Sequence, residues 1–406
     1  MFAWRRKHGE TFGMFELSHI ASPVPIRSSA SKTTTIGARL DLHRGWTNGF
    51  DYMRLVLACS VIGWHSVFTS YGYRYEAGVY ASWIHVVIYP ILPMFFALGG
   101  FLVAASLFRS QSVAEYLLLR VLRFFPALLV VIVLSTFVLG PLLTSVPLPA
   151  YFHDPMTFHY LLNALGWFEE ALPGVFSNNP APDLVNVSLW TIPWEFGCSV
   201  VLSALMFCRP SSRGTWLAVV SVLVMLLVPT VAIATHTEAG LFSRPPGHLL
   251  AMAFCAGVCL FYFRYRIPFS FPIFIACLAL SLLLFMRAKS GYLAVIPIGY
   301  VTIYLGLQHP TKYGFMKRAD LSYGVYLYGC VMQQMVISLF PAMRVWWINW
   351  AVSLSLALAC AAGSWYLVES QVLRRRRQII ARLLSLGTST PAVVADRNAS
   401  SSAVVG

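Results

Sequence analysis

The segment FDYMRLVLACSVIGWHSVFTS, residues 50–70, is long and apolar enough to cross a lipid bilayer as a helix, since ~20 residues span the ~30 Å hydrocarbon core. It nevertheless contains Arg54 near its start and His65 well inside. Their separation corresponds to about three helical turns, so both side chains share one face, ~16 Å apart along the axis. Ionisable groups inside a span cost on the order of 3 kcal/mol and therefore indicate a function. The structural alternative pairs Arg54 with Asp51 and uses His65 to tie helices together.

The composition places the whole chain in the class of polytopic membrane proteins. Of its 406 residues, 58% are hydrophobic and only 11% are charged, which leaves too little polar surface for a water-soluble protein. The net charge of +14 comes from cations in tails and short connections, as the positive-inside rule predicts, so no nucleic-acid partner is expected. The eight cysteines lie in or beside apolar segments without metal-ligand spacing, so no metal is expected either.

The hydropathy pattern predicts an all-α helical bundle of about ten transmembrane helices. These spans are expected near residues 50–70, 84–108 and 116–140, in a fourth span that opens with 188–197, and near 215–235, 247–264, 269–287, 291–308, 320–340 and 347–368. Most Lys and Arg residues then fall on the side of the N-terminus, which predicts that both termini are cytoplasmic.

Three regions follow from this pattern. Residues 1–49 are polar and basic and are expected to form a disordered cytoplasmic tail. Residues 50–369 form the transmembrane domain, in which 141–187 make a long outer loop with a short surface helix near 158–172. Aromatic, carboxylate and amide groups in this loop suit a carbohydrate, although a loop packed on the membrane surface has the same composition. Residues 370–406 begin with a basic amphipathic stretch, expected to lie on anionic lipid, and end in a disordered tail.

Two further spans contain charged residues. Arg120 and Arg123 are three residues apart in LLLRVLRFFPALL (117–129), so they share a helix face and form a candidate anion site, or else two cytoplasmic anchors. Glu195 in SLWTIPWEF (188–196) lies in an otherwise apolar helix, and a buried carboxylate needs a partner. His65 is the expected partner, in the outer half of the membrane; the alternative is a Glu195 side chain turned to water.

These motifs resemble the integral-membrane acyltransferase family 3, whose members O-acylate bacterial surface glycans, exopolysaccharides and Nod factors. DYMRLVLACSVIGWH resembles the family's Arg/Lys-to-His opening motif, and LRVLRFFPALL its RxxR motif. FFALGGFLVAAS, SLWTIPWEF, LSYGVYLYG and YLVESQ are similar to four further family motifs and follow in the same order. The chain departs from the usual pattern at Gly99 (usually Ser), Gly329 (often His) and 370–371 (usually Arg-Pro). Because Gly329 stands where the family often has a histidine, His65 is favoured more strongly as the functional histidine.

The resemblance implies an acyltransferase of the bacterial inner membrane. Acyl-CoA, with acetyl-CoA as the family's common donor, would enter from the cytoplasm, with its phosphates on Arg120 and Arg123 and with Arg54 holding CoA or shaping the channel. His65 would take the proton of a hydroxyl on a glycan or lipid-linked saccharide, and Glu195 would orient His65. The alternative mechanism passes through a covalent acyl-His65 intermediate.

Two other function classes fit the same residues. In a transporter or flippase for a lipid-linked or anionic amphiphile, the ionisable residues would relay protons and bind cargo; such a protein usually has two similar halves with broken helices, and the sequence has no such repeat. In a catalytically silent subunit of a polysaccharide-synthesis complex, the motifs would serve folding alone.

Overall fold

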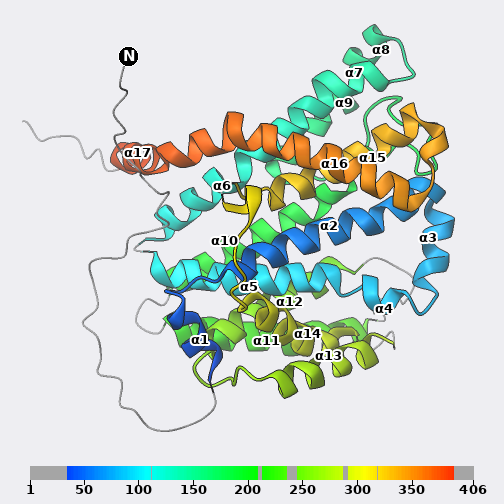
Figure 1. Ribbon diagram of the computed structural model, residues 1–406. Helices are drawn as coiled ribbons and strands as arrows, with labels where there is room; N and C mark the ends of the chain where they lie inside the picture. Colours follow the sequence, from blue (N-terminus) through cyan, green and yellow to red (C-terminus); the bar gives the residue numbers. More distant parts are fainter. Residues whose placement is uncertain are drawn as a thin grey trace, which may run out of the picture.

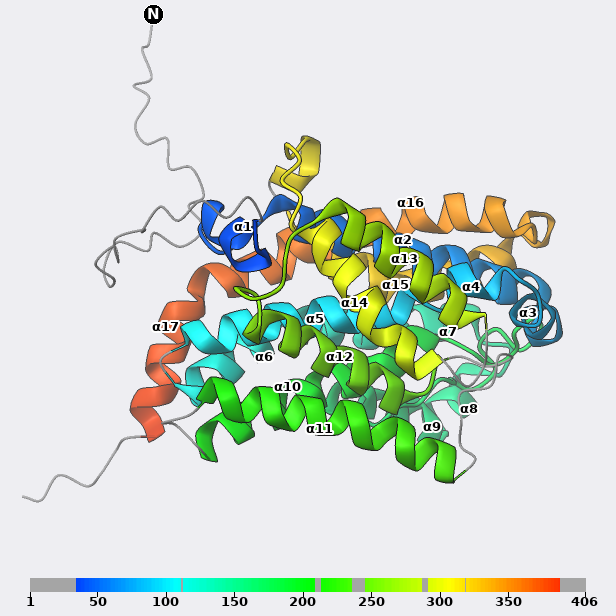
Figure 2. The ribbon, with the colours of Figure 1, turned by 90° about the horizontal axis from the view of Figure 1, so that it is seen from below.

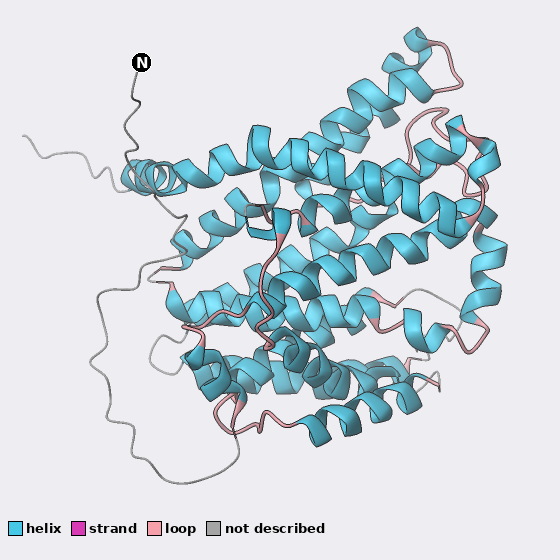
Figure 3. Cartoon of the chain, in the orientation of Figure 1, coloured by secondary structure: helices cyan, strands magenta, loops and turns pink. Residues whose placement is uncertain are grey.

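The computed structural model describes residues 34–110, 112–208, 213–235, 245–286, 291–317 and 319–387. Within these ranges the chain is a bundle of helices (Figures 1 and 3), as predicted for an all-α protein. The extended structure in these ranges consists of two isolated β-bridges. The two ends of the sequence, 1–33 and 388–406, were predicted to be disordered and lie outside the described residues.

Each of the ten predicted spans contains a helix. They are α2 (Asn48–Tyr71), α5 (Ile91–Arg109), α6 (Val113–Leu134), α10 (Ile192–Cys208), α11 (Arg213–Ala234), α12 (Gly247–Tyr262), α13 (Phe271–Phe285), α14 (Gly291–Gly306), α15 (Ser322–Leu339) and α16 (Trp346–Ser364). Six helical stretches among the described residues are long and apolar enough to cross a membrane, and α12 to α14 are shorter apolar helices. The chain is therefore a multi-pass membrane protein, while the count of ten spans and the orientation stay predictions.

Helices α5 and α12 pack closely because glycines on each face the partner backbone. A Cβ added to Gly100 would lie 2.0 Å from the carbonyl oxygen of Phe254, and one added to Gly257 would lie 2.0 Å from that of Ala97. Small residues let transmembrane helices approach until their backbones touch. Because lipid is as apolar as the side chains, no hydrophobic effect holds such helices together, and dispersion between the closely packed atoms supplies the attraction. This contact fixes α5, which forms one wall of the site described below.

The predicted N-terminal tail is ordered in its last part. Helix α1 (Ile36–Leu42) is capped by Thr35, whose side chain accepts a 3.1 Å hydrogen bond from the Ala38 amide, and Ile36 is fully buried. Apolar residues one turn apart on this short helix, Ile36 and Leu40, pack against the bundle. The folded region therefore begins before residue 50, because a short amphipathic turn was counted with the polar tail.

At the other end, α16 continues through the π-helical η8 (Trp365–Glu369) into α17 (Ser370–Gly387). Figure 2 shows α17 turning away from the axis of α16 and running across one end of the bundle. Four consecutive arginines, 374–377, lie on this helix. A basic helix across the end of a bundle has the orientation expected for the membrane surface.

The long connection between α6 and α10 differs from the predicted surface loop. After η1 (Ser135–Leu139) it forms α7 (Gly140–Leu143), α8 (Leu148–His153), α9 (Pro155–His159) and η2 (Tyr160–Leu165). The surface helix expected over 158–172 stops at Gly166, whose φ of +86° ends it. The remainder descends along α15: the Asn179 amide donates to the Gln334 carbonyl at 2.9 Å, and the Asn186 amide to the Leu327 carbonyl at 2.8 Å. The start of α10 is thus carried deep into the bundle.

Two smaller helices, α3 (Tyr73–Tyr80) and α4 (His85–Ile88), join α2 to α5 at the end of the bundle opposite α1 and α17 (Figure 1). Because this connection stays at one end of the bundle (Figure 1), α2 and α5 run in opposite directions. At the end that holds α1 and α17, the connection after α14 lies over the start of α2 and includes η6 (Gly314–Lys317). At the other end, η7 (Pro341–Met343) joins α15 to α16.

Candidate active site

A cavity of about 260 Å³ opens between α2, α5, α6, α10 and α15. On α5 its lining runs from Leu92 to Ser106, and residues so separated on a helix lie ~21 Å apart along the axis. The cavity is therefore a narrow shaft parallel to the helices. Its polar lining includes Arg54, Arg120, Arg123, Glu195, Tyr323 and Tyr326.

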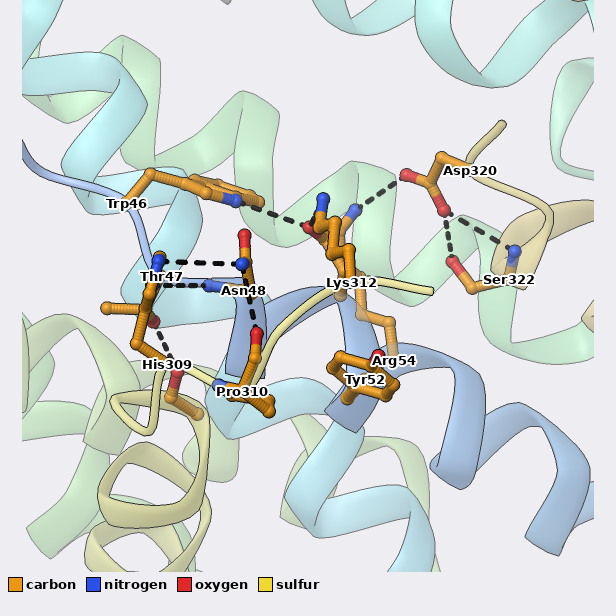
Figure 4. A network of polar contacts seen from close by, with 12 residues as sticks. Trp46, Thr47, Asn48, Tyr52, Arg54, His309, Pro310, Lys312, Asp320 and Ser322 are labelled. Atoms are coloured by element: carbon orange, nitrogen blue, oxygen red, sulfur yellow. Dashed lines mark hydrogen bonds and ion pairs between the residues drawn. The ribbon is translucent and has the colours of Figure 1, made fainter. Parts of the chain in front are cut away.

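All three predicted arginines line this shaft, and each is held by a carboxylate. Arg54 Nη2 donates to Asp51 at 2.8 Å and Arg54 Nη1 to Asp320 at 3.1 Å (Figure 4). Arg123 Nη2 donates to the same Asp320 oxygen at 2.6 Å. The sequence had allowed Asp51 as a partner of Arg54 but contains no pattern that identifies Asp320. Their ion pairs join α2, α6 and the start of α15 at one level of the bundle.

The residues before α15 bring Asp320 to this position. The connection after α14 lies over the first turns of α2, where the Asn48 amide donates to the Pro310 carbonyl at 3.0 Å and the Tyr52 hydroxyl to the Thr311 carbonyl at 2.9 Å (Figure 4). Lys312 closes the same connection by an ion pair with Asp51. The signal in the sequence that could have identified Asp320 is its position as an isolated acid at the start of an apolar span.

Asp320 lies in the connection before α15, which begins at Ser322, and is enclosed by charged groups. Burial alone would raise the pKa of its carboxyl, but the guanidiniums of Arg123 and Arg54, with hydrogen bonds from Ser322, hold the pKa well below its usual range. The Ser322 hydroxyl donates to Oδ1 at 2.7 Å, which leaves Oδ2 to the two arginines. Asp320 is therefore ionised at neutral pH and fixes both cations.

Two further carboxylates complete the charge balance. Glu369, only 2% exposed, lies 3.5 Å from Arg123 Nη1 and accepts a 3.0 Å hydrogen bond from the Ser364 hydroxyl. Glu195 Oε1 lies 3.5 Å from Arg120 Nη2. Every cavity arginine is thus compensated, so the site is less cationic than the spacing of Arg120 and Arg123 alone indicated.

The compensation is incomplete at the level of hydrogen bonds. In the described part of the chain, Nε of Arg54, Nε of Arg120 and Nη1 of Arg123 are buried and have no hydrogen-bond partner. Buried donors are normally satisfied, and an unsatisfied one in a native structure calls for an explanation. A ligand with oxygen acceptors in the shaft supplies one, since guanidinium donors match phosphate and carbonyl oxygens.

His65 lies beyond the shaft. The ring centroids of Phe50 and Phe101 are 5.8 Å apart, which sets the level of the antiparallel α2 against α5. Counting outward from this pair, Leu92 lies level with residue 59 of α2, so His65 is ~9 Å farther along the axis. The imidazole packs edge-on against Phe68, and its buried Nδ1 has no hydrogen-bond partner among the described residues.

The predicted pairing of Glu195 with His65 is wrong. Thr191, one turn before Glu195, forms a 2.6 Å hydrogen bond with Tyr326, which lies near the start of α15. Since the preceding connection descends along α15, it carries Glu195 to the level of the arginines, near the start of α15. The carboxylate therefore pairs with Arg120 and not with the histidine.

Within the described residues, no group of three or more His, Cys, Asp or Glu side chains is arranged to hold a metal ion. The polar groups in and above the shaft include guanidinium donors, carboxylates, tyrosine hydroxyls and the half-buried imidazole of His65.

Comparisons with known proteins identify the family of the chain. The acyltransferase family 3 model, described as an acyltransferase domain, matches residues 47–369. An O-acetyl transferase of Shigella phage Sf6 is 25% identical over 362 residues, which cover 81% of this chain and 97% of the phage protein. Nodulation protein 10 of Rhizobium leguminosarum bv. viciae is 27% identical over 369 residues, covering 84% and 97%. No solved structure matches the chain.

The matched domain begins just before α2, includes all the charged residues that line the shaft, and ends at Glu369. Because it covers most of the sequence, the chain belongs to acyltransferase family 3 and is a membrane acyltransferase.

Proposed function

We propose that this protein transfers an acetyl group from cytoplasmic acetyl-CoA to a hydroxyl of a surface or exported glycan, across a bacterial inner membrane. The name of the phage relative supports the acetyl group. The observation that carries the proposal is the shaft itself, which holds three arginines with unsatisfied buried N–H groups and points along the bundle toward His65.

The dimensions suit a CoA thioester. Arg54, level with the other two arginines, would bind the phosphates. His65 lies ~16 Å farther along α2, a distance comparable with an extended phosphopantetheine arm. The outer part of the shaft is lined by apolar and hydroxyl side chains such as Phe95, Thr191 and Tyr326, which suit the uncharged arm better than the nucleotide. In this arrangement the thioester reaches the level of the histidine while the nucleotide stays at the cytoplasmic mouth.

His65 would act as the general base. Helical side chains lean toward the N-terminus of their helix, so the imidazole on α2 leans back toward the shaft and shortens the remaining gap. Neutral Nε2 takes the proton of the acceptor hydroxyl as its oxygen attacks the thioester carbonyl. The C–S bond then breaks, and the imidazolium returns the proton to the departing CoA thiolate. One C–O bond replaces one C–S bond, and no proton is gained or lost.

The carboxylates of the site would act through the arginines. Asp320 holds Arg54 and Arg123, and Glu195 holds Arg120, so that the three guanidiniums would be in place before substrate binds. Fixed dipoles and charges that need no rearrangement bind a substrate at the lowest free-energy cost. Glu195 is therefore assigned to donor binding in place of the orienting role expected from the sequence.

Proton NMR of surface polysaccharide tests this function. A strain without the protein is complemented with wild type, His65→Ala or His159→Ala; His159 is an exposed histidine in the outer connection and serves as the matched control. An O-acetyl resonance that returns with wild type and His159→Ala, but not with equally abundant His65→Ala, supports the proposal. Unchanged acetylation with polysaccharide missing from the surface would instead identify a transporter.

A further inference from the structure

A buried amide lies at the level of His65 on the neighbouring helix. Helices α2 and α15 run in the same direction, because Arg54 pairs with Asp320 near their starts and Gly329 faces Ile62 farther along. Measured from the contact of Gly329 with Ile62, Gln333 is ~6 Å farther on α15 and His65 is ~4.5 Å farther on α2. The two side chains therefore lie at the same height in the bundle, on helices in direct contact.

Only one half of the Gln333 side chain is satisfied. The residue is fully buried, and its Nε2 donates a 2.6 Å hydrogen bond to the Ile62 carbonyl, one turn before His65. Its Oε1 is buried and has no hydrogen-bond partner among the described residues. The bond through Nε2 fixes the amide so that Oε1 is the free end. Leaving a buried acceptor unmatched is destabilising, a cost that a purely structural glutamine would not be expected to carry.

The complementary donor is the imidazole. His65 Nδ1 is also buried and without a partner, so one unpaired donor or acceptor lies on each of two adjoining helices at one level. No hydrogen bond of its ring nitrogens holds the imidazole among the described residues, and its edge-on contact with Phe68 is a packing contact only. Catalytic hydrogen bonds are often long before substrate binds and shorten in the complex.

We propose that Gln333 is the positioning residue of the acyl transfer: its Oε1 accepts the Nδ1 hydrogen of His65 and holds the imidazole in the tautomer that leaves Nε2 unprotonated for the acceptor hydroxyl. The hydrogen bond of one ring nitrogen decides which tautomer the other presents. This inference rests on the proposed role of His65. It assigns to Gln333 the function that the sequence had suggested for Glu195.

The adjacent Gln334 provides a matched control. It is equally buried, but both ends of its amide are satisfied: Nε2 donates to the Ala181 and Leu184 carbonyls at 2.8 Å, and Oε1 accepts a 2.9 Å hydrogen bond from Asn179. Gln334 therefore anchors the descending connection and has no free group to offer. Replacing Gln334 is expected to reduce stability without a specific effect on proton transfer.

The test uses full-length protein in everted vesicles of the strain that contains its own glycan, made permeable to protons, with acetyl-CoA as the donor. Release of CoA thiol is followed per folded protein, as determined by fluorescence-detected size exclusion. We expect Gln333→Leu to lower kcat tenfold or more with the donor KM within twofold of wild type, and Gln334→Leu to keep kcat within threefold. Equal losses of kcat for the two leucine variants would overturn the proposal.

Gln333→Glu adds a readout that a structural role does not move. The carboxylate retains the acceptor and stabilises the imidazolium, so kcat recovers above that of Gln333→Leu and the acid limb of its pH profile moves up by about one pH unit. A folded Gln333→Glu whose acid limb coincides with that of wild type overturns the proposal; if it does not fold, the comparison of the leucine variants decides. His65→Ala in the same assay separates the two claims: full activity rejects the role of His65 itself, whereas an inactive His65→Ala beside a fully active Gln333→Leu rejects only the positioning role.

Discussion

Arg123 donates a 2.6 Å hydrogen bond to Asp320, and this pair joins α6 to the start of α15. The same carboxylate oxygen also binds Arg54 of α2. One acid thus sets the positions of two arginines on two different helices. The position of this carboxylate therefore affects both the stability of the bundle and the placement of the two arginines that line the shaft.

Asp320→Asn should therefore lower the stability of the bundle and weaken the positioning of the two arginines. The amide keeps the size of the side chain but leaves two guanidiniums without their charge partner, and we expect the free energy of unfolding to fall by roughly 2 kcal/mol, less than for a fully buried pair. Thermal unfolding of the detergent-solubilised protein measures this change. Asp183→Asn is the control, because it makes the same substitution on an exposed residue. Equal melting temperatures for the two variants would contradict the assigned role.

The low pKa of the Asp320 carboxyl predicts a specific pH dependence. A depressed folded-state pKa contributes stability that is complete above the unfolded-state value, ~3.9, and is lost as the pH falls from there toward the folded-state pKa. The melting temperature of the wild type should therefore drop on acidification below about pH 4. Asp320→Asn should show a shallower drop over the same window, and parallel curves would argue against a strongly stabilised carboxylate.

The charged residues of the site were the easiest to identify from the sequence, for a thermodynamic reason. An arginine within an apolar span is costly wherever the helix packs, so Arg54, Arg120 and Arg123 were recognisable without knowing their neighbours. Their partners were not, because pairing depends on which helices meet and at what height. Asp320 is distant in sequence from both of its arginines, and no local spacing relates it to them.

The error over Glu195 has a related cause. Counting residues from the start of a span assumes that the span begins at the membrane surface. Here the preceding connection enters the bundle along α15, held by the Asn186 amide on the Leu327 carbonyl. Hydropathy cannot register such a displacement, because a buried connection and a buried helix have similar composition.

A double-mutant cycle distinguishes the two roles of Glu195. If Glu195 holds Arg120 for donor binding, Arg120→Met and Glu195→Gln each raise the KM for acetyl-CoA, by tenfold or more and severalfold respectively, with an interaction energy of about 1 kcal/mol. If Glu195 oriented His65, its replacement would lower kcat and its effect would add independently to that of Arg120→Met. Initial rates over a range of acetyl-CoA concentrations, in the vesicle assay described above, separate these outcomes.

Adjacent glycines on α5 give a test of the shaft that is independent of charge. Gly99 lines the cavity, and a Cβ there would meet Glu195 Oε1 at 3.9 Å and Phe254 at 4.0 Å, which is ordinary contact. Gly99→Ala and Gly99→Ser should therefore fold and retain activity. Gly99→Leu projects into the shaft, so it should remain folded while the KM for acetyl-CoA rises tenfold or more, because the leucine occupies the space proposed for the pantetheine arm.

Gly100, about 100° further around α5, faces the backbone of α12, and its replacement should act on stability instead. The added methyl of Gly100→Ala would lie 2.0 Å from the Phe254 carbonyl oxygen, a backbone atom that can yield only if α5 and α12 separate. Overpacking of this kind costs about 3 kcal/mol, so we expect a lower melting temperature and less folded protein, with the KM for acetyl-CoA unchanged in what remains. Because the two positions are neighbours in sequence, differences in expression or insertion cannot easily account for opposite effects. A folded Gly99→Leu with the wild-type KM would show that the donor does not enter this shaft.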